Sequence, residues 1–187
     1  MTNDFVLQGR AWIFGNKLDA DWQICSLDRL EKLKNQGIPL IAEELGKYCM
    51  ESVDPDFVHR VSPGDFIVAG ENIGYSAACL DGDSDDPHFI GAASLAIKGA
   101  GISAVLCESS GMGFLMTSIN LGLPVVECQE LHGKVHPGDQ LQLNLTQGII
   151  ANLDSGEEYR FVPYPPRLVE MVQEGGLYAH LEGKRKQ

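Results

Sequence analysis

Three short, unbroken apolar runs constrain the fold of this chain more than any other feature. They lie at Phe66–Ala69, Ser103–Cys107 and Pro124–Glu127. Two small-residue segments with the character of short helices, Gly91–Lys98 and Gly111–Leu121, alternate with them. Strands that lack polar alternation need cover on both faces, as in a sheet of parallel strands. The pattern therefore predicts an α/β core in which helices connect parallel strands.

The C-terminal third has a different pattern, because Leu141, Leu143 and Leu145 alternate with polar residues. A hairpin turn is expected at Asp154-Ser155-Gly156, so this part reads as antiparallel sheet with one face toward water. The other expected elements are a strand at Phe5–Phe14 and helices at Leu27–Lys34, Ile41–Met50 and Arg167–Gln173. No repeat or low-complexity linker divides the sequence, and 187 residues suffice for one full core. We expect a single domain over residues 1–187.

The net charge of −12 excludes some classes of partner. A nucleic-acid surface needs clustered Lys and Arg, and so does a surface that binds anionic membranes. No apolar run approaches the length of a membrane span, and the N-terminus does not resemble a signal peptide. The five cysteines are scattered and form no CxxC pair, which favours a reduced, cytoplasmic chain. They are also too dispersed to predict an iron–sulfur cluster on this chain.

Four strings spread along the chain resemble one known family. They are GRAWIFGNKLDAD from Gly9, DFIVAGENIG from Asp65, SINLGLP from Ser118 and GGLYAHL from Gly175. In order and spacing they resemble the small subunit of isopropylmalate isomerase (3-isopropylmalate dehydratase), a member of the aconitase family. The resemblance implies a swivelling α/β domain that is inactive alone. It would serve a hydro-lyase whose partner is a large subunit with a [4Fe–4S] cluster, and whose substrate is a small hydroxy acid.

The segment that should carry the family's catalytic serine and arginine is rewritten. Counting forward from Gly74 places Ala77 and Ala78 at the two serines of the family motif and Cys79 at its arginine. Counting backward from Ala100-Gly101 places His88 and Phe89 at the serines and Ile90 at the arginine. The counts disagree because this chain has extra residues here, including the acidic run Asp81–Asp86.

Three residues near this segment are candidates for the catalytic base. His88 follows the acidic run and can abstract a proton near neutral pH, although a lone histidine is more often structural. Ser76 and Tyr75 compete with it as hydroxyl groups beside the glycine-rich turn. We expect the segment Tyr75–Phe89 to be exposed and mobile until a partner or ligand orders it.

Five further residues are candidates for substrate binding. Asp19 and Asp21 match an aspartate pair of the family, and capping of local backbone amides is the alternative role. Gly70 and Gly74 would let a ligand approach the backbone closely. Asn72 lies between them, with a turn residue of unusual backbone angle as the alternative.

A second motif of the family also differs here, because Met112 and Met116 stand at positions of two arginines. Arginine binds planar carboxylates through paired hydrogen bonds, so these changes predict weak binding of isopropylmalate. Two functions remain open. The chain is either a catalytic subunit for a different hydroxy acid or a non-catalytic regulatory or structural partner of a large subunit. The gain of residues in the rewritten segment favours the enzyme.

Overall fold

The computed structural model describes residues 4–75 and 91–185. In chain order its strands are β1 (Val6–Ile13), β2 (Phe66–Ala69), β3 (Ala104–Cys107), β4 (Val125–Glu127), β5 (Gln140–Asn144), β6 (Ile149–Asn152) and β7 (Glu158–Arg160). The α-helices are α1 (Leu27–Asn35), α2 (Ala42–Leu45), α3 (Phe57–Arg60), α4 (Ala92–Gly99), α5 (Met112–Asn120), α6 (Pro166–Gln173) and α7 (Leu177–Arg185). A π-helical turn, η1 (Ala20–Ile24), and a 3-10 turn, η2 (Gly46–Tyr48), complete the set.

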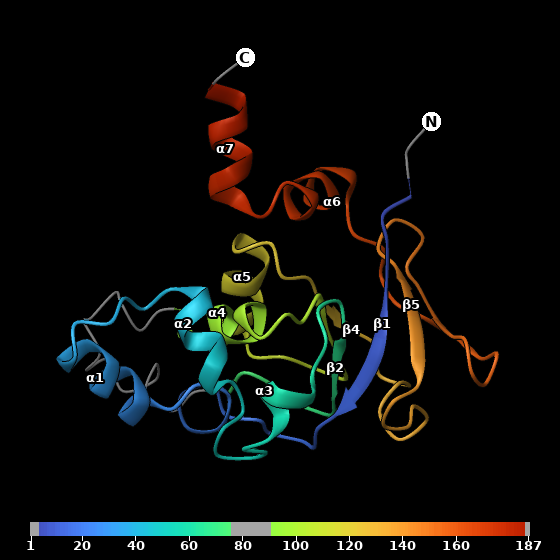
Figure 1. Ribbon diagram of the computed structural model, residues 1–187. Coiled ribbons are helices and arrows are strands. Elements are labelled where there is room, and N and C mark those ends of the chain that lie inside the picture. The colour runs from blue at the N-terminus through green and yellow to red at the C-terminus, as the bar shows by residue number, and fades with distance from the viewer. Residues whose placement is uncertain (1–3, 76–90, 186–187) are drawn as a thin grey trace.

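All seven strands belong to one sheet in the order β4-β3-β2-β1-β5-β6-β7. Figure 1 shows β1 beside β5. The first half, β4 to β1, is parallel, with register pairs such as Trp12 with Ile67 and Ile67 with Val105. The second half, β5 to β7, is antiparallel and joins β1 through β5. The expected α/β fold with an antiparallel C-terminal sheet is therefore confirmed.

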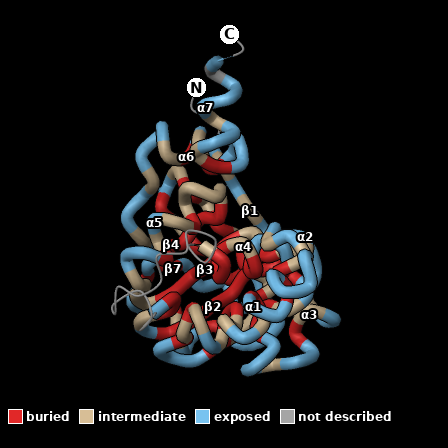
Figure 2. The backbone as a smooth tube through the Cα atoms, turned by 90° about the vertical axis from the view of Figure 1, so that its left-hand side faces the viewer, coloured by how far each residue is buried: buried red, intermediate tan, exposed pale blue. Residues whose placement is uncertain are grey.

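The parallel strands are buried on both faces, as their unbroken apolar runs require. Along β2, Ile67 and Ala69 face one hydrophobic core, and Phe66 and Val68 face another. The first core is closed by the helices α1 to α5. Figure 2 shows buried backbone through the centre of the molecule and exposed backbone around it.

The antiparallel half covers the other face of the parallel strands. Buried and half-buried residues alternate along β5, and Leu141 and Leu143 point inward. Leu141, Leu143 and Ile150 share one core with Phe66 and Leu106 from the parallel half. The sheet therefore curls upon itself, so that its two halves enclose this core together with α6.

Curling brings the two edge strands of the sheet close together. The thiol of Cys128, directly after β4, donates to the carbonyl of Arg160 in β7 over 3.5 Å. Tyr164 bridges the same gap, since its hydroxyl donates to the carbonyl of Val125 (2.6 Å) and accepts from the Val125 amide (3.2 Å). Burial raises the pKa of the Tyr164 hydroxyl well above its usual value, so the bridge stays protonated.

A carboxylate fastens the opposite end of the parallel strands. Asp65 is 4% exposed and accepts from the Trp12 indole (2.8 Å), the Ser62 amide (2.9 Å) and the Arg10 guanidinium. Burial opposes ionisation of Asp65, but these hydrogen bonds outweigh it and hold the pKa below its usual value. The start of β2 is thereby fixed to β1.

The chain ends differently from expectation. The helix predicted at Arg167–Gln173 is α6, but a further helix, α7, follows the glycine pair Gly175 and Gly176, which both have positive φ. The predicted helix at Ile41–Met50 is divided into α2 and η2. Among the described residues, no helix has the length and apolarity to cross a membrane.

Candidate functional site

Loops gather at the carboxyl ends of β1, β2 and β3, where parallel α/β sheets commonly bind ligands. The loop after β1 contains Asp19, the turn after β2 runs from Gly70 to Tyr75, and the loop after β3 leads into α5. Five of the candidate site residues, Asp19, Gly70, Asn72, Gly74 and Tyr75, therefore lie on one edge of the sheet.

Backbone hydrogen bonds attach the turn at 70–75 to the loop after β1. The Lys17 amide donates to the Glu71 carbonyl (2.7 Å), and the Gly74 amide donates to the Leu18 carbonyl (2.8 Å). The Ala20 amide donates to the Tyr75 carbonyl (2.7 Å). The two loops thus form one backbone framework.

The loop after β3 holds the turn from its other side. The Asn72 amide donates to the Ser109 hydroxyl (2.9 Å), and the Ile73 amide donates to the Ser109 carbonyl (3.1 Å). The Gly111 amide donates in turn to the Ile73 carbonyl (2.8 Å). Pairing on both sides fixes the direction in which the chain leaves the turn at Tyr75.

Packing within the protein accounts for both glycines of the turn. A β-carbon on Gly74 would overlap the Phe114 ring, and one on Gly70 would overlap the Asn16 side chain. Gly74 also has a φ of +73°, which favours glycine. Close approach of a ligand to Gly70 or Gly74 stays a prediction.

Asn72 adopts a left-handed backbone, with a φ of +62°. Asparagine is among the few residues that tolerate this conformation. The turn role that the sequence offered as one reading of Asn72 is thus present in the structure. A contact between its side chain and substrate stays a prediction.

Asp19 performs the capping role that the sequence offered as one of two readings. Its carboxylate accepts from the amides of Asp21 (2.8 Å) and Trp22 (3.0 Å) at the start of η1. The π-helical turn itself was not expected from the sequence. Asp21 is half-buried on the same turn. A role of either aspartate toward substrate is not tested by these contacts.

Tyr75 is the last described residue before the rewritten segment, and it is 40% exposed. Its backbone pairs with Asp19 in an isolated bridge, which places it at the rim of the loop cluster. The other two candidate bases, Ser76 and His88, lie outside the described residues, as does the segment expected to be mobile.

Met112 and Met116 lie on α5, which starts beside the turn. Gly111 lies so close to the turn that a β-carbon there would come within 2.8 Å of the Gly74 carbonyl oxygen. Met112 is 72% exposed and Met116 is 55% exposed. The i, i+4 spacing puts both thioethers on one side of the helix.

Sequence reasoning missed two polar contacts on this edge. The amide and the hydroxyl of Ser110 both donate to one oxygen of Glu127, over 2.8 and 2.7 Å. His132 lies beside Gly70, with its Nε2 atom 3.1 Å from the Phe14 carbonyl oxygen. The sequence could have indicated that Ser110 and Glu127 lie near each other, because each follows or ends one of two adjacent buried strands.

The described thiols do not fit an iron–sulfur cluster, which binds several gathered thiolates. Cys25, Cys49, Cys107 and Cys128 are free and buried. Burial, with help from Asp21 and Glu51, raises the pKa of Cys25 to about 12, and burial also raises the pKa of Cys49. Within residues 4–75 and 91–185, no three His, Cys, Asp or Glu side chains are placed to hold a metal ion.

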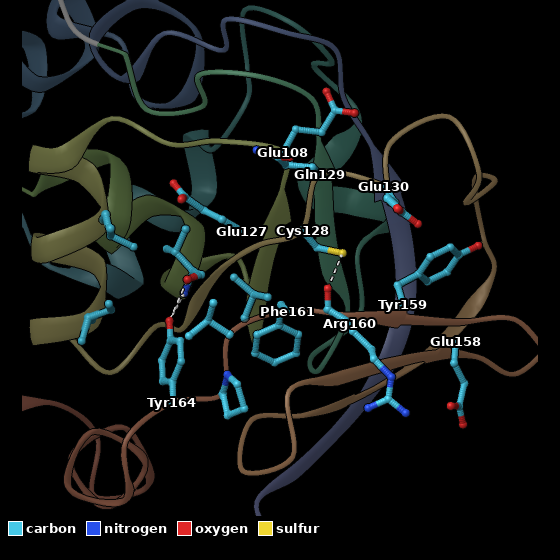
Figure 3. A pocket seen from close by; sticks show the side chains of 16 residues that line it. Glu108, Glu127, Cys128, Gln129, Glu130, Glu158, Tyr159, Arg160, Phe161 and Tyr164 are labelled. Atoms are coloured by element: carbon cyan, nitrogen blue, oxygen red, sulfur yellow. Dashed lines mark hydrogen bonds between the residues drawn. The ribbon is translucent and has the colours of Figure 1, made fainter.

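An open groove of about 1100 Å³ borders the site (Figure 3). It lies between the two sheet edges and reaches the carboxyl ends of β3 and β4 at Glu108 and Glu127. Its lining includes Leu115 and Ile119 of α5 and the stretch from Glu158 to Tyr164. This hollow is called the edge groove below.

No family model matches the chain, but individual relatives match it over nearly its whole length. It is 38% identical to the isopropylmalate/citramalate isomerase small subunit of Methanocaldococcus jannaschii, over 96% of this chain and 95% of that protein. It is 37% identical to the 3-isopropylmalate dehydratase small subunit of Nautilia profundicola, over 92% of each chain. A crystal structure of 3-isopropylmalate dehydratase from M. jannaschii superposes with a TM-score of 0.78 and 26% identity, covering 97% of this chain and 96% of that one.

The fold and its loop-bearing edge place this chain in the aconitase-type α/β class. Within that class, the chain belongs to the family of 3-isopropylmalate dehydratase small subunits. The resemblance seen in the sequence is thereby confirmed.

Proposed function

We propose that this chain is the small subunit of a two-subunit hydro-lyase that dehydrates or isomerises a small hydroxy acid. Residues 1–187 would act as one swivelling domain that closes over an iron–sulfur large subunit. The observation that carries the proposal is near-full-length similarity to proteins named as small subunits of this enzyme. The buried free thiols suit a reducing compartment, so we place the enzyme in the cytoplasm.

This chain would supply the closing wall of the active site. A [4Fe–4S] cluster of the partner would bind the hydroxyl and a carboxylate of the substrate when the complex forms. The turn at 70–75 is fixed on both sides by backbone hydrogen bonds, so it can present Asn72 and Tyr75 in a constant geometry. A hydroxyl or imidazole from Tyr75, Ser76 or His88 would move the proton.

The substrate would differ from isopropylmalate. Met112 and Met116 are exposed on the helix that begins beside the turn, at positions where the family motif has arginines. Thioethers cannot make charge-assisted hydrogen bonds to a carboxylate. We propose that this part of the site accepts an uncharged group of the substrate.

Co-expression with large subunits of the 3-isopropylmalate dehydratase family tests the proposal. The two chains are expected to purify together, and the anaerobically reconstituted complex is expected to dehydrate or hydrate a member of a panel of hydroxy acids. Failure to bind any large subunit would refute the proposal. Stable binding without turnover of any acid would favour a regulatory or structural partner instead.

A further inference from the structure

The helix α7 extends away from the body of the molecule (Figures 1 and 2). Tyr178 is 75% exposed and Leu181 is 49% exposed. Leu177 and His180 are only half-buried. A helix of nine residues is too short to be stable in water without tertiary contacts. An exposed apolar side on such a helix therefore indicates a surface that another molecule covers.

The base of α7 is nevertheless held firmly to the end of α5. A β-carbon on Gly176 would overlap the Asn120 carbonyl oxygen, so the two backbones are in direct contact. A β-carbon on Gly122 would come within 2.5 Å of the Gly175 carbonyl carbon. His180 also bonds Glu174 through Nδ1 over 2.6 Å. These contacts fix the direction in which the helix leaves the body.

The lining of the edge groove combines apolar and acidic side chains, which could complement the apolar and basic side chains of α7. Apolar side chains contribute to its lining, among them Leu115, Ile119 and Val162, and Val162 is 85% exposed. The lining also contains four glutamates and one basic residue, Arg160; the glutamates are Glu108, Glu127, Glu130 and Glu158. Figure 3 shows several of these carboxylates around the hollow.

We propose that α7 docks into the edge groove of a second copy of this chain, and that two copies exchange these helices in a symmetric dimer. Tyr178 and Leu181 would cover the apolar lining. The helix ends in Arg185, a basic residue in a chain of net charge −12, and its guanidinium would face the glutamates.

The choice of a second copy follows from where the two surfaces lie. The base of α7 contacts the C-terminal end of α5 at Asn120, and the same helix lines the groove with Leu115 and Ile119. A two-fold axis beside α5 would therefore bring each projecting helix over the groove of the other copy. Such an interface is self-complementary, so it closes at two chains.

Sedimentation of the full chain over a range of concentrations tests the proposal. The wild-type chain is expected to form a dimer, and Tyr178→Glu with Leu181→Glu is expected to raise the dimer dissociation constant by about tenfold or more. Glu158→Lys and Arg185→Glu are each expected to weaken the dimer. Their combination is expected to restore part of the loss, because the charge pair is reversed rather than removed.

The matched control is Val53→Glu, which places the same charge at a position that is 41% exposed and outside both surfaces. It is expected to leave the dimer unchanged, and thermal melting checks that every variant is folded. A monomeric wild-type chain at high concentration would overturn the proposal. So would a dimer that persists with glutamate at both 178 and 181, or protection of α7 from hydrogen exchange only when the large subunit is added. These measurements need no turnover and are independent of the proposed catalysis.

Discussion

The Phe114 ring lies against the α-carbon of Gly74 and fills the space that any side chain on Gly74 would need. Phe114 belongs to α5 and Gly74 to the turn after β2, so this contact joins the two elements that frame the candidate site. The glycine is required by packing as well as by its positive φ.

Gly74→Ala is expected to destabilise the protein by about 2 kcal/mol or more, because overlap with Phe114 adds to an unfavourable backbone angle. Gly113→Ala is the control. Gly113 lies inside α5 with open space around it, and alanine there is expected to stabilise by up to about 1 kcal/mol. Chemical unfolding of both variants measures the difference. Equal stabilities would contradict this account of the contact.

Asp65 should make folding sensitive to acid. Its folded pKa is lowered, so its contribution to stability is complete above its unfolded pKa of about 4 and is lost as the pH falls through the folded value. Asp65→Asn is expected to cost about 1–3 kcal/mol at pH 7, and the difference from wild type should shrink in acid. Glu130→Gln, which removes an exposed ion pair with Lys134, should show no such trend.

The catalytic base can be identified by comparing three variants in the reconstituted complex. The variants are His88→Ala, Ser76→Ala and Tyr75→Phe. The one that removes the residue that moves the proton is expected to lower kcat by about 100-fold or more. Binding of the large subunit should be unchanged in all three. Full activity in every variant would remove these residues from the mechanism.

Substrate preference should follow the two methionines of α5. The wild-type complex is expected to turn over 3-isopropylmalate poorly. Met112→Arg with Met116→Arg should improve kcat/KM for this diacid by about tenfold or more, since each restored charge-assisted hydrogen bond contributes about 1.5–3 kcal/mol. Met112→Leu with Met116→Leu is the matched control and should resemble wild type. Efficient turnover of 3-isopropylmalate by the wild-type complex would show the substrate proposal to be wrong.

Four of the five thiols should resist modification in the folded chain. Cys25, Cys49, Cys107 and Cys128 are buried, and burial raises the pKa of each. In a Cys79→Ser variant, a disulfide reagent is expected to react with no thiol quickly under native conditions and with four after denaturation. Rapid native reaction at any of the four would contradict their burial.

The strands at Phe66–Ala69 and Ala104–Cys107 were predictable because a strand buried on both faces appears in the sequence as an unbroken apolar run. The helix α7 was not, because the glycine pair Gly175 and Gly176 before it is typical of the end of a helix rather than of a break between two helices. In the site, the left-handed backbone at Asn72 could be anticipated from its residue type and its neighbouring glycines. The sequence places Ser110 and Glu127 after adjacent buried strands, but the hydrogen bond between them depends on the path of the loop after β3, which the sequence does not predict.

The curl of the sheet also affects how readily this chain could aggregate through its edge strands. An open sheet normally presents unpaired edge strands that can recruit other chains into aggregates. Here the Tyr164 hydroxyl occupies both polar backbone groups of Val125 on one edge, and the Cys128 thiol caps the Arg160 carbonyl on the other. These two side chains occupy edge groups from within the protein, which leaves fewer backbone groups free to pair with the strands of another chain.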